Sequence, residues 1–326
     1  MNRWGIVATI KANAKEIISF AAHHLELGVD ELHIYLDTPC PRAEEALADN
    51  PRVKIIQCDE KYWRMRRPRE EHQRPPMHQA RQFANTKWAY MHNNVDWLIH
   101  IDVDEFLWAE RDVRDQLAAL PDAALCARIR PLEALSTEGQ DLPKGVTPFK
   151  SAALEWDQRR RETRDIYPTY GDFLNGGFLS HLAGKMAVRT GQPDMMVKIH
   201  NVEQNGTLNP GEAELPDLTL CHMHAHTWDQ WRKSLTYRRR KGSYRAELAP
   251  PVAPPGTKPD PDALNLNQLF DMIEEHGGDE ALRGFFEEVC LATPVLRERL
   301  DRYGRLQMRK LDLRGARKRQ FGPDWA

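Results

Sequence analysis

Short apolar runs alternate with helical patterns through the first hundred residues, and this alternation is the strongest constraint on the fold. The apolar runs have the length of strands buried on both faces, and they cover residues 5–10, 31–36, 53–57 and 96–101. Between them, apolar residues recur at helical spacing over 14–27 and 77–93. Strands and helices in this order predict right-handed βαβ units, and therefore an α/β fold with a mostly parallel sheet flanked by helices.

The fourth apolar run leads directly into three acidic residues, in the order Asp102-Val103-Asp104-Glu105. In an open α/β sheet, ligands bind at the carboxyl ends of the strands. Two carboxylates separated by one residue can converge on one hard cation, which can in turn hold phosphate oxygens. Acidic pairs are also common in ordinary turns, but here a third acid is followed at once by the apolar run 106–108. The sequence therefore predicts a cation site at Asp102 and Asp104.

The pattern weakens after residue 130, which sets the expected domain boundaries. Residues 1–249 are expected to form one domain in two halves, over about 1–130 and about 131–249. A linker is expected at 250–262, because six prolines fall within residues 250–261. Helical patterns over 265–276, 280–291 and 294–311 predict a helical, basic C-terminal extension at 263–326.

Composition excludes several classes of protein. The net charge of −2 argues against a general nucleic-acid binder. Five scattered cysteines without a C-x-x-C pair indicate a reducing compartment, and no apolar segment is long enough to span a membrane. We therefore expect a cytoplasmic protein. Basic runs at 238–241 and 301–326 would suit peripheral contact with the anionic inner face of a membrane.

The N-terminal third resembles the family-2-like glycosyltransferases of the GT-A type, in particular the subset with an Asp-x-Asp-Glu-Phe core. The core is matched by Asp102-Val103-Asp104-Glu105-Phe106, and weaker matches are Ile10-Lys11-Ala12-Asn13, Phe20-Ala21-Ala22-His23-His24, Leu27-Gly28-Val29-Asp30 and Ile34-Tyr35-Leu36-Asp37. Two departures are visible. The Lys-Asn-Glu start of the family is Lys11-Ala12-Asn13 here, and its Tyr-Asp-Asn is Tyr35-Leu36-Asp37, so Asp37 stands one position later.

The resemblance implies a metal-dependent, inverting transfer of a sugar from a nucleotide-sugar donor, with a UDP-sugar favoured, to a hydroxyl of a saccharide or glycolipid. It implies Mn or Mg beneath the diphosphate, a nucleotide-binding half over about 1–130 and an acceptor half over about 131–249. Asp104 would be the direct metal ligand, Asp102 would lie near the ribose or the metal, and Glu105 would support the loop or face the sugar. The candidate phosphate or nucleotide contacts are Lys11, Asp37, Arg81 and Lys185.

The same resemblance extends loosely to residues 176–231, where Cys221-His222-Met223-His224-Ala225-His226 carries three histidines. On an extended segment these side chains would face one side, so we expect His222 and His224 to contribute metal ligands; ordinary polar histidines at a strand end are the alternative. An inverting transferase also needs a base for the acceptor proton. Four acids qualify by position (Asp165, Asp172, Glu155 and Asp157), and we favour Asp172 because a glycine-supported loop surrounds it.

Two other functions fit parts of the pattern. Asp-x-Asp phosphatases use one aspartate as nucleophile and the other as acid, but their motif typically follows the first strand, whereas here it follows about the fourth. A non-catalytic glycan-binding protein on the same fold is the other alternative, because the acid of the Lys-Asn-Glu start is missing.

Overall fold

The computed structural model describes residues 2–67 and 73–325, and the chain forms two compact units. The first unit comprises Met1–Arg130, Ala183–Leu220 and Asp312–Ala326, and the second comprises Pro131–Leu182 and Cys221–Leu311. Each unit therefore joins segments that are far apart in the sequence.

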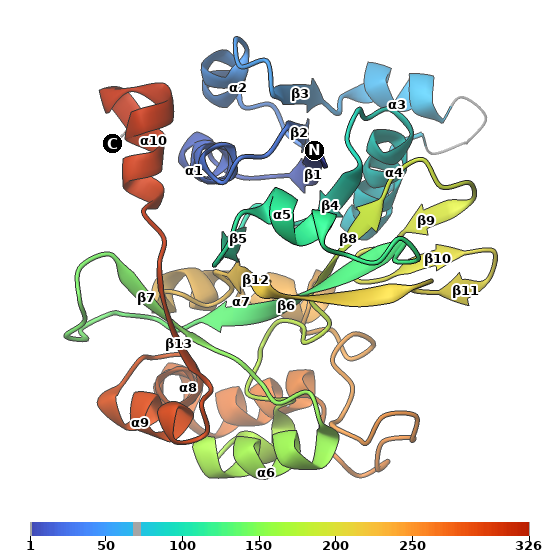
Figure 1. The fold of residues 1–326 in the computed structure, drawn as a ribbon. Helices are drawn as coiled ribbons and strands as arrows, with labels where there is room; N and C mark the ends of the chain where they lie inside the picture. The colour runs from blue at the N-terminus through green and yellow to red at the C-terminus, as the bar shows by residue number, and fades with distance from the viewer. Residues whose placement is uncertain (1, 68–72, 326) are drawn as a thin grey trace. The chain divides into compact units, whose positions relative to one another are not determined.

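Four parallel strands, in the order β3-β2-β1-β4, form the centre of the first unit (Figure 1). Their bounds are Trp4–Ile10 (β1), Glu31–Leu36 (β2), Val53–Gln57 (β3) and Trp97–His100 (β4). Beyond β4 the pairing becomes antiparallel, first with β8 (Lys185–Arg189) and then with β6 (Cys126–Ala134). The predicted α/β fold is confirmed, and the sheet is mixed.

Further strands complete this unit. Strand β12 (Glu212–His222) pairs with β5 (Glu105–Ala109) and with β6. A separate three-stranded sheet consists of β9 (Met195–Val197), β10 (Val202–Gln204) and β11 (Thr207–Leu208).

Helices accompany these strands in the first unit. They are α1 (Ala14–Glu26), α2 (Pro41–Leu47), α3 (Glu60–Arg66), α4 (His78–Met91), α5 (Val113–Ala118), α10 (Leu313–Phe321) and the 3-10 turn η2 (Pro323–Trp325). Asn13 caps α1 through a capping box with Glu16, and Gly28 follows its end with φ 93°. Asp59 caps α3, and Tyr62 and Trp63 of this helix are buried.

The C-terminal helix α10 belongs to the first unit, although the sequence suggested a separate extension. It packs on α1, and the Arg317 guanidinium donates to the Ser19 hydroxyl at 2.7 Å. Arg319 forms an ion pair with Glu26 at 2.8 Å. Contacts across almost three hundred residues therefore decide where this helix lies.

The second unit has an aromatic core. Figure 1 shows the helices of this unit. The core includes Trp231, Tyr244, Phe270 and Phe285. The elements of this unit are β7 (Val146–Lys150), α6 (Trp156–Ile166), η1 (Gly171–Phe173), α7 (Trp228–Lys241), α8 (Leu266–Val289), α9 (Pro294–Arg302) and β13 (Leu306–Lys310). Gly278, with φ 56°, breaks α8 between the two helices that the sequence predicted.

The helix expected over 294–311 ends at Arg302, and β13 pairs antiparallel with β7. Gly304 adopts φ 66°, and its N–H donates to the Asp301 carbonyl at 2.8 Å. The Arg305 N–H donates to the Leu300 carbonyl at 2.8 Å, which completes a Schellman motif. The prediction of one long helix was wrong because Gly304 ends α9 in this way.

Candidate active site

Three of the predicted site segments follow neighbouring strands at one edge of the parallel sheet. Lys11 follows β1, Asp37 follows β2 and the Asp102 turn follows β4. The Asp37 N–H donates to the Ile10 carbonyl at 2.8 Å, so the ends of β1 and β2 are in register. This edge is the carboxyl edge of the parallel strands, where α/β proteins bind their ligands.

The acidic residues form a tight turn between β4 and β5. The Asp102 N–H donates to Glu105 Oε2 at 2.7 Å, and the Glu105 N–H donates to the Asp102 carbonyl at 3.0 Å. Glu105 is completely buried, whereas Asp102 and Asp104 are half-buried. Glu105 therefore holds the shape of the turn, and the two aspartates form its open side.

Lys185 lies directly against this turn. Strand β8 is antiparallel to β4, with Ala187 opposite Ile99, so Lys185 at the start of β8 reaches the end of β4. Its completely buried Nζ lies 2.7 Å from Asp102 Oδ2 and 3.2 Å from Glu105 Oε2. Lys185 was predicted to be a nucleotide contact. Its ion pair with Asp102 was not predicted from the sequence.

Burial and pairing act in opposite directions on these groups. Burial alone would raise the pKa of Asp102, but the Lys185 ammonium lowers it, and the net pKa lies well below the usual range. Gln82 of α4 also donates a hydrogen bond to Asp102 Oδ1. Burial lowers the pKa of the neighbouring His100 to about 4, so its imidazole is neutral near pH 7.

The charges of the turn fit a divalent cation. With the three carboxylates ionised and Lys185 protonated, the site carries −3 + 1 = −2, which one Mg or Mn ion would balance. Carboxylate oxygens are the ligands that such hard cations prefer, and each accepts more than one interaction. The half-buried Asp104 and Asp102 are therefore the residues of this turn that suit a metal.

Asp37 and Arg81, both predicted nucleotide contacts, bind each other. Arg81 Nε lies 2.9 Å from both carboxylate oxygens of Asp37, and its Nη2 lies 2.7 Å from Oδ2. Arg74 and His78 also reach this carboxylate, at 3.2 and 3.6 Å. Burial alone would raise the pKa of Asp37, but His78 and the arginines outweigh burial and hold this pKa well below its usual range. Asp37 is therefore ionised. Lys11, by contrast, is exposed at the same edge.

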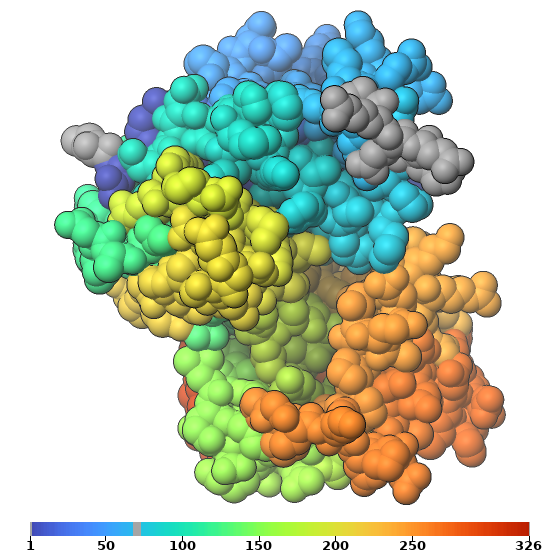
Figure 2. Space-filling model, turned by 90° about the vertical axis from the view of Figure 1, so that its right-hand side faces the viewer, coloured from blue at the N-terminus to red at the C-terminus, as the bar shows by residue number. Residues whose placement is uncertain are grey.

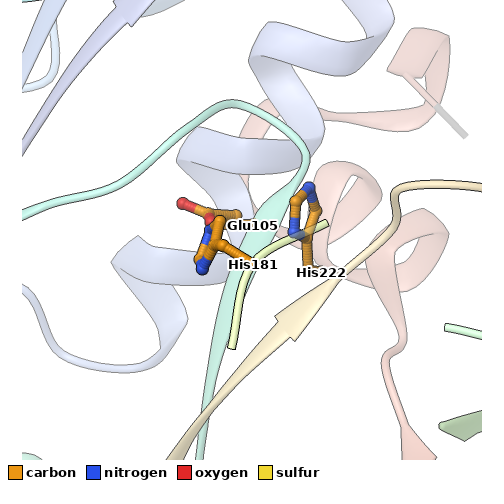
Figure 3. Close-up of side chains that lie close together, drawn as sticks. All are labelled: Glu105, His181 and His222. Carbon is orange, nitrogen blue, oxygen red and sulfur yellow. The ribbon is translucent and has the colours of Figure 1, made fainter. Parts of the chain in front are cut away.

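The predicted histidine ligands cluster in the second unit. The His222 and His224 rings lie 5.1 Å apart between centroids, and the His181 ring lies 5.6 Å from that of His222. Figure 3 shows His181 and His222 beside each other, and it also labels Glu105 of β5, which belongs to the first unit. His224 Nε2 is 2.9 Å from the Tyr244 hydroxyl. No pattern in the sequence indicated His181.

Asp172, the favoured base, lies in η1 of the second unit with an exposed carboxylate. Arg164 Nε and Arg160 Nη2 lie 2.7 and 3.1 Å from its Oδ1. Of the other acids considered, Glu155 caps α6 and Asp165 accepts a hydrogen bond from the Tyr303 hydroxyl at 2.6 Å. The role of Asp172 as a base stays a prediction.

Among the described residues, no helix combines the length and apolar character needed to cross a bilayer.

Comparison with known proteins found no matching family model and no matching curated protein. Several solved structures match distantly. Crystal structures of S. aureus TarS 1-349 and of GalNAc-T7 with UDP, GalNAc and Mn2+ match at 14% and 10% identity, over 57% and 69% of this chain, with TM-scores of 0.29 and 0.35. This chain covers only 47% and 44% of those two chains.

A nucleotidyl transferase from Methanothermobacter thermautotroptrophicus also matches. It is 12% identical over 44% of this chain and 70% of its own, with a TM-score of 0.26. Likeness at these identities and TM-scores concerns the fold alone.

Proposed function

We propose that this chain is a GT-A-type glycosyltransferase that moves a sugar from a nucleotide-sugar donor, with a UDP-sugar favoured, to a hydroxyl of a saccharide or glycolipid, with inversion. The observation that carries this proposal is the Asp102–Asp104 turn at the carboxyl end of β4, with Lys185 buried against it. This turn offers half-buried carboxylates at the edge where such folds bind ligands.

The residues of the turn have different parts in the proposal. Asp104 and Asp102 hold Mn or Mg, and Lys185 keeps Asp102 ionised and in place. When bound, the metal neutralises charge on the departing nucleoside diphosphate. Glu105 keeps the backbone of the turn closed through the Asp102 N–H.

The remaining assignments rest on position. Lys11, exposed at the same edge, is proposed to contact phosphate, and the paired Asp37 and Arg81 to border the nucleotide. His222 and His224 are proposed as further metal ligands, and Asp172 as the base that accepts the proton of the acceptor hydroxyl.

Thermal unfolding with a panel of nucleoside diphosphates, with and without Mn, tests the donor site. A ligand that binds only the folded protein stabilises it by about 2.7 kcal/mol at a hundredfold excess over its Kd. We expect one diphosphate to stabilise the protein only with Mn, and Asp104→Ala to abolish the effect. Asp122→Ala, which removes an exposed aspartate elsewhere in the first unit, is the matched control and should leave the effect intact.

A missing shift, or a shift that survives Asp104→Ala, would refute the donor site. Hydrolysis of an aryl phosphate that depends on Asp102 would then favour the phosphatase. Glycan binding without metal and without donor turnover would favour the non-catalytic alternative.

A further inference from the structure

Helices α3 and α4 of the first unit expose apolar side chains to solvent. Met65, Phe83 and Met91 are 65%, 37% and 56% exposed. Figure 2 turns this face toward the viewer, with α3 in light blue and α4 in cyan. On α4, Phe83, Lys87 and Met91 follow one another at four-residue intervals along the solvent face, while Asn85 is buried on the opposite side. The outer face of α4 is thus partly apolar, which is unusual for a solvated helix.

Positive charge concentrates in the same segment. Residues 60–67 and 73–91 carry seven Lys and Arg and one Glu. Arg74 and Arg81 of this set pair with Asp37, which leaves five cations against Glu60. Lys61, Arg64 and Lys87 are exposed beside the apolar side chains. We call the set Lys61, Arg64, Met65, Phe83, Lys87 and Met91 the α3–α4 surface.

A groove of about 470 Å³ lies between the two helices. Its lining includes Phe83 and Trp88, with Lys87 and Arg66 among them, and Trp63 is completely buried beneath it. The Arg66 guanidinium lies 3.1 Å from the centroid of the Trp88 ring. An aromatic lining with cations at its rim suits an amphiphile that has an anionic head and an apolar body.

Several arginines of the basic runs at 238–241 and 301–326 have partners inside the protein. Arg239 pairs with Asp271 and Glu274 on α8. In the C-terminal run, Arg317 is buried against Ser19, and Arg319 pairs with Glu26. These arginines therefore already interact with partners within the fold.

We propose that the α3–α4 surface binds an anionic lipid bilayer. Met65, Phe83 and Met91 enter the boundary between headgroups and acyl chains, and Lys61, Arg64 and Lys87 contact lipid phosphates. Apolar side chains beside clustered lysine and arginine are the combination by which peripheral proteins bind anionic membranes. The proposal goes beyond the transferase activity and does not depend on it.

Co-sedimentation with vesicles tests the proposal without any enzymatic readout. The full chain is mixed with vesicles of phosphatidylcholine, or of phosphatidylcholine with phosphatidylglycerol. We expect binding only to the anionic vesicles, weakened by salt. Arg64→Gln with Lys87→Gln should weaken binding roughly 30-fold, from about 1 kcal/mol for each charge. Met65→Ser with Met91→Ser should weaken it by about tenfold, because less apolar surface enters the bilayer.

Arg240→Gln with Lys241→Gln is the matched control, because it removes the same charge from two exposed residues of the second unit. It should leave binding within about twofold. Unfolding curves confirm that each variant is folded. The proposal is overturned if the protein ignores anionic vesicles, if it binds both vesicle types equally, or if the control pair weakens binding as much as Arg64→Gln with Lys87→Gln.

Discussion

Replacing Lys185 with methionine should destabilise the first unit strongly. The Lys185 ammonium is completely buried between Asp102 and Glu105, at 2.7 and 3.2 Å. Methionine keeps the volume and removes the charge, so Glu105 becomes a fully buried carboxylate without its counter-ion. Removing one member of a buried ion pair typically costs about 3–5 kcal/mol.

Urea unfolding of wild type and Lys185→Met measures this cost. Thermal unfolding gives a second measure of the same loss of about 3–5 kcal/mol. For a first unit of about 180 residues, it corresponds to a decrease of roughly 6–20 °C in the melting temperature. Lys198→Met is the matched control, because Lys198 is 46% exposed and pairs with Glu203 at the surface of the same unit. That change should cost no more than about 1 kcal/mol.

A double variant separates the charge from the packing. Glu105→Gln added to Lys185→Met removes the orphaned buried charge, and the glutamine oxygen can still accept the Asp102 N–H. We expect it to recover about 1–3 kcal/mol, since groups in direct contact couple by this amount. The reasoning is refuted if Lys185→Met costs as little as Lys198→Met, or if the second substitution destabilises further.

Three further predictions concern the rest of the molecule. Burial raises the pKa of Glu31, but Lys54 and His33 lower it to about 2 from its ordinary 4.5, so its stabilisation is present above pH 4.5 and is lost as the pH falls through about 2. Wild type should therefore exceed Glu31→Gln by roughly 1–2 kcal/mol above pH 5, because Lys54 is 40% exposed and solvent screens the pair, and by almost nothing near pH 2. Urea midpoints across this range measure the difference, and a difference independent of pH would contradict the prediction. In the second unit, Lys150→Met should cost about 3–5 kcal/mol by urea unfolding, because the buried Lys150 lies 3.1 Å from the buried Glu133; a cost below about 1 kcal/mol would refute this. If Asp172 is the base, Asp172→Asn lowers kcat by about 10²–10⁴-fold with unfolding unchanged, whereas an unchanged kcat removes Asp172 from the mechanism.

Local patterns in the sequence determined most of the elements of this protein. The apolar runs ending at Ile10, Leu36 and Ile101 form parallel strands. The acidic turn follows β4, which is the strand of the run ending at Ile101. Asn13 and Gly28 mark the ends of α1. These features could be predicted because strand and helix periods, caps and glycine stops depend on residues only a few positions apart. Gly304 is a signal of the same kind and marks the end of α9.

The partners within the site were decided only by the tertiary structure. Lys185 lies 83 residues from Asp102 and reaches it because β8 pairs antiparallel with β4. Arg81 meets Asp37 across 44 residues, and the C-terminal helix α10 packs on α1 of the first unit. Periodicity reports which face of an element is buried, but it does not report which strand becomes its neighbour. The chemistry of the turn was therefore visible in the sequence, whereas its electrostatic balance emerged only on folding.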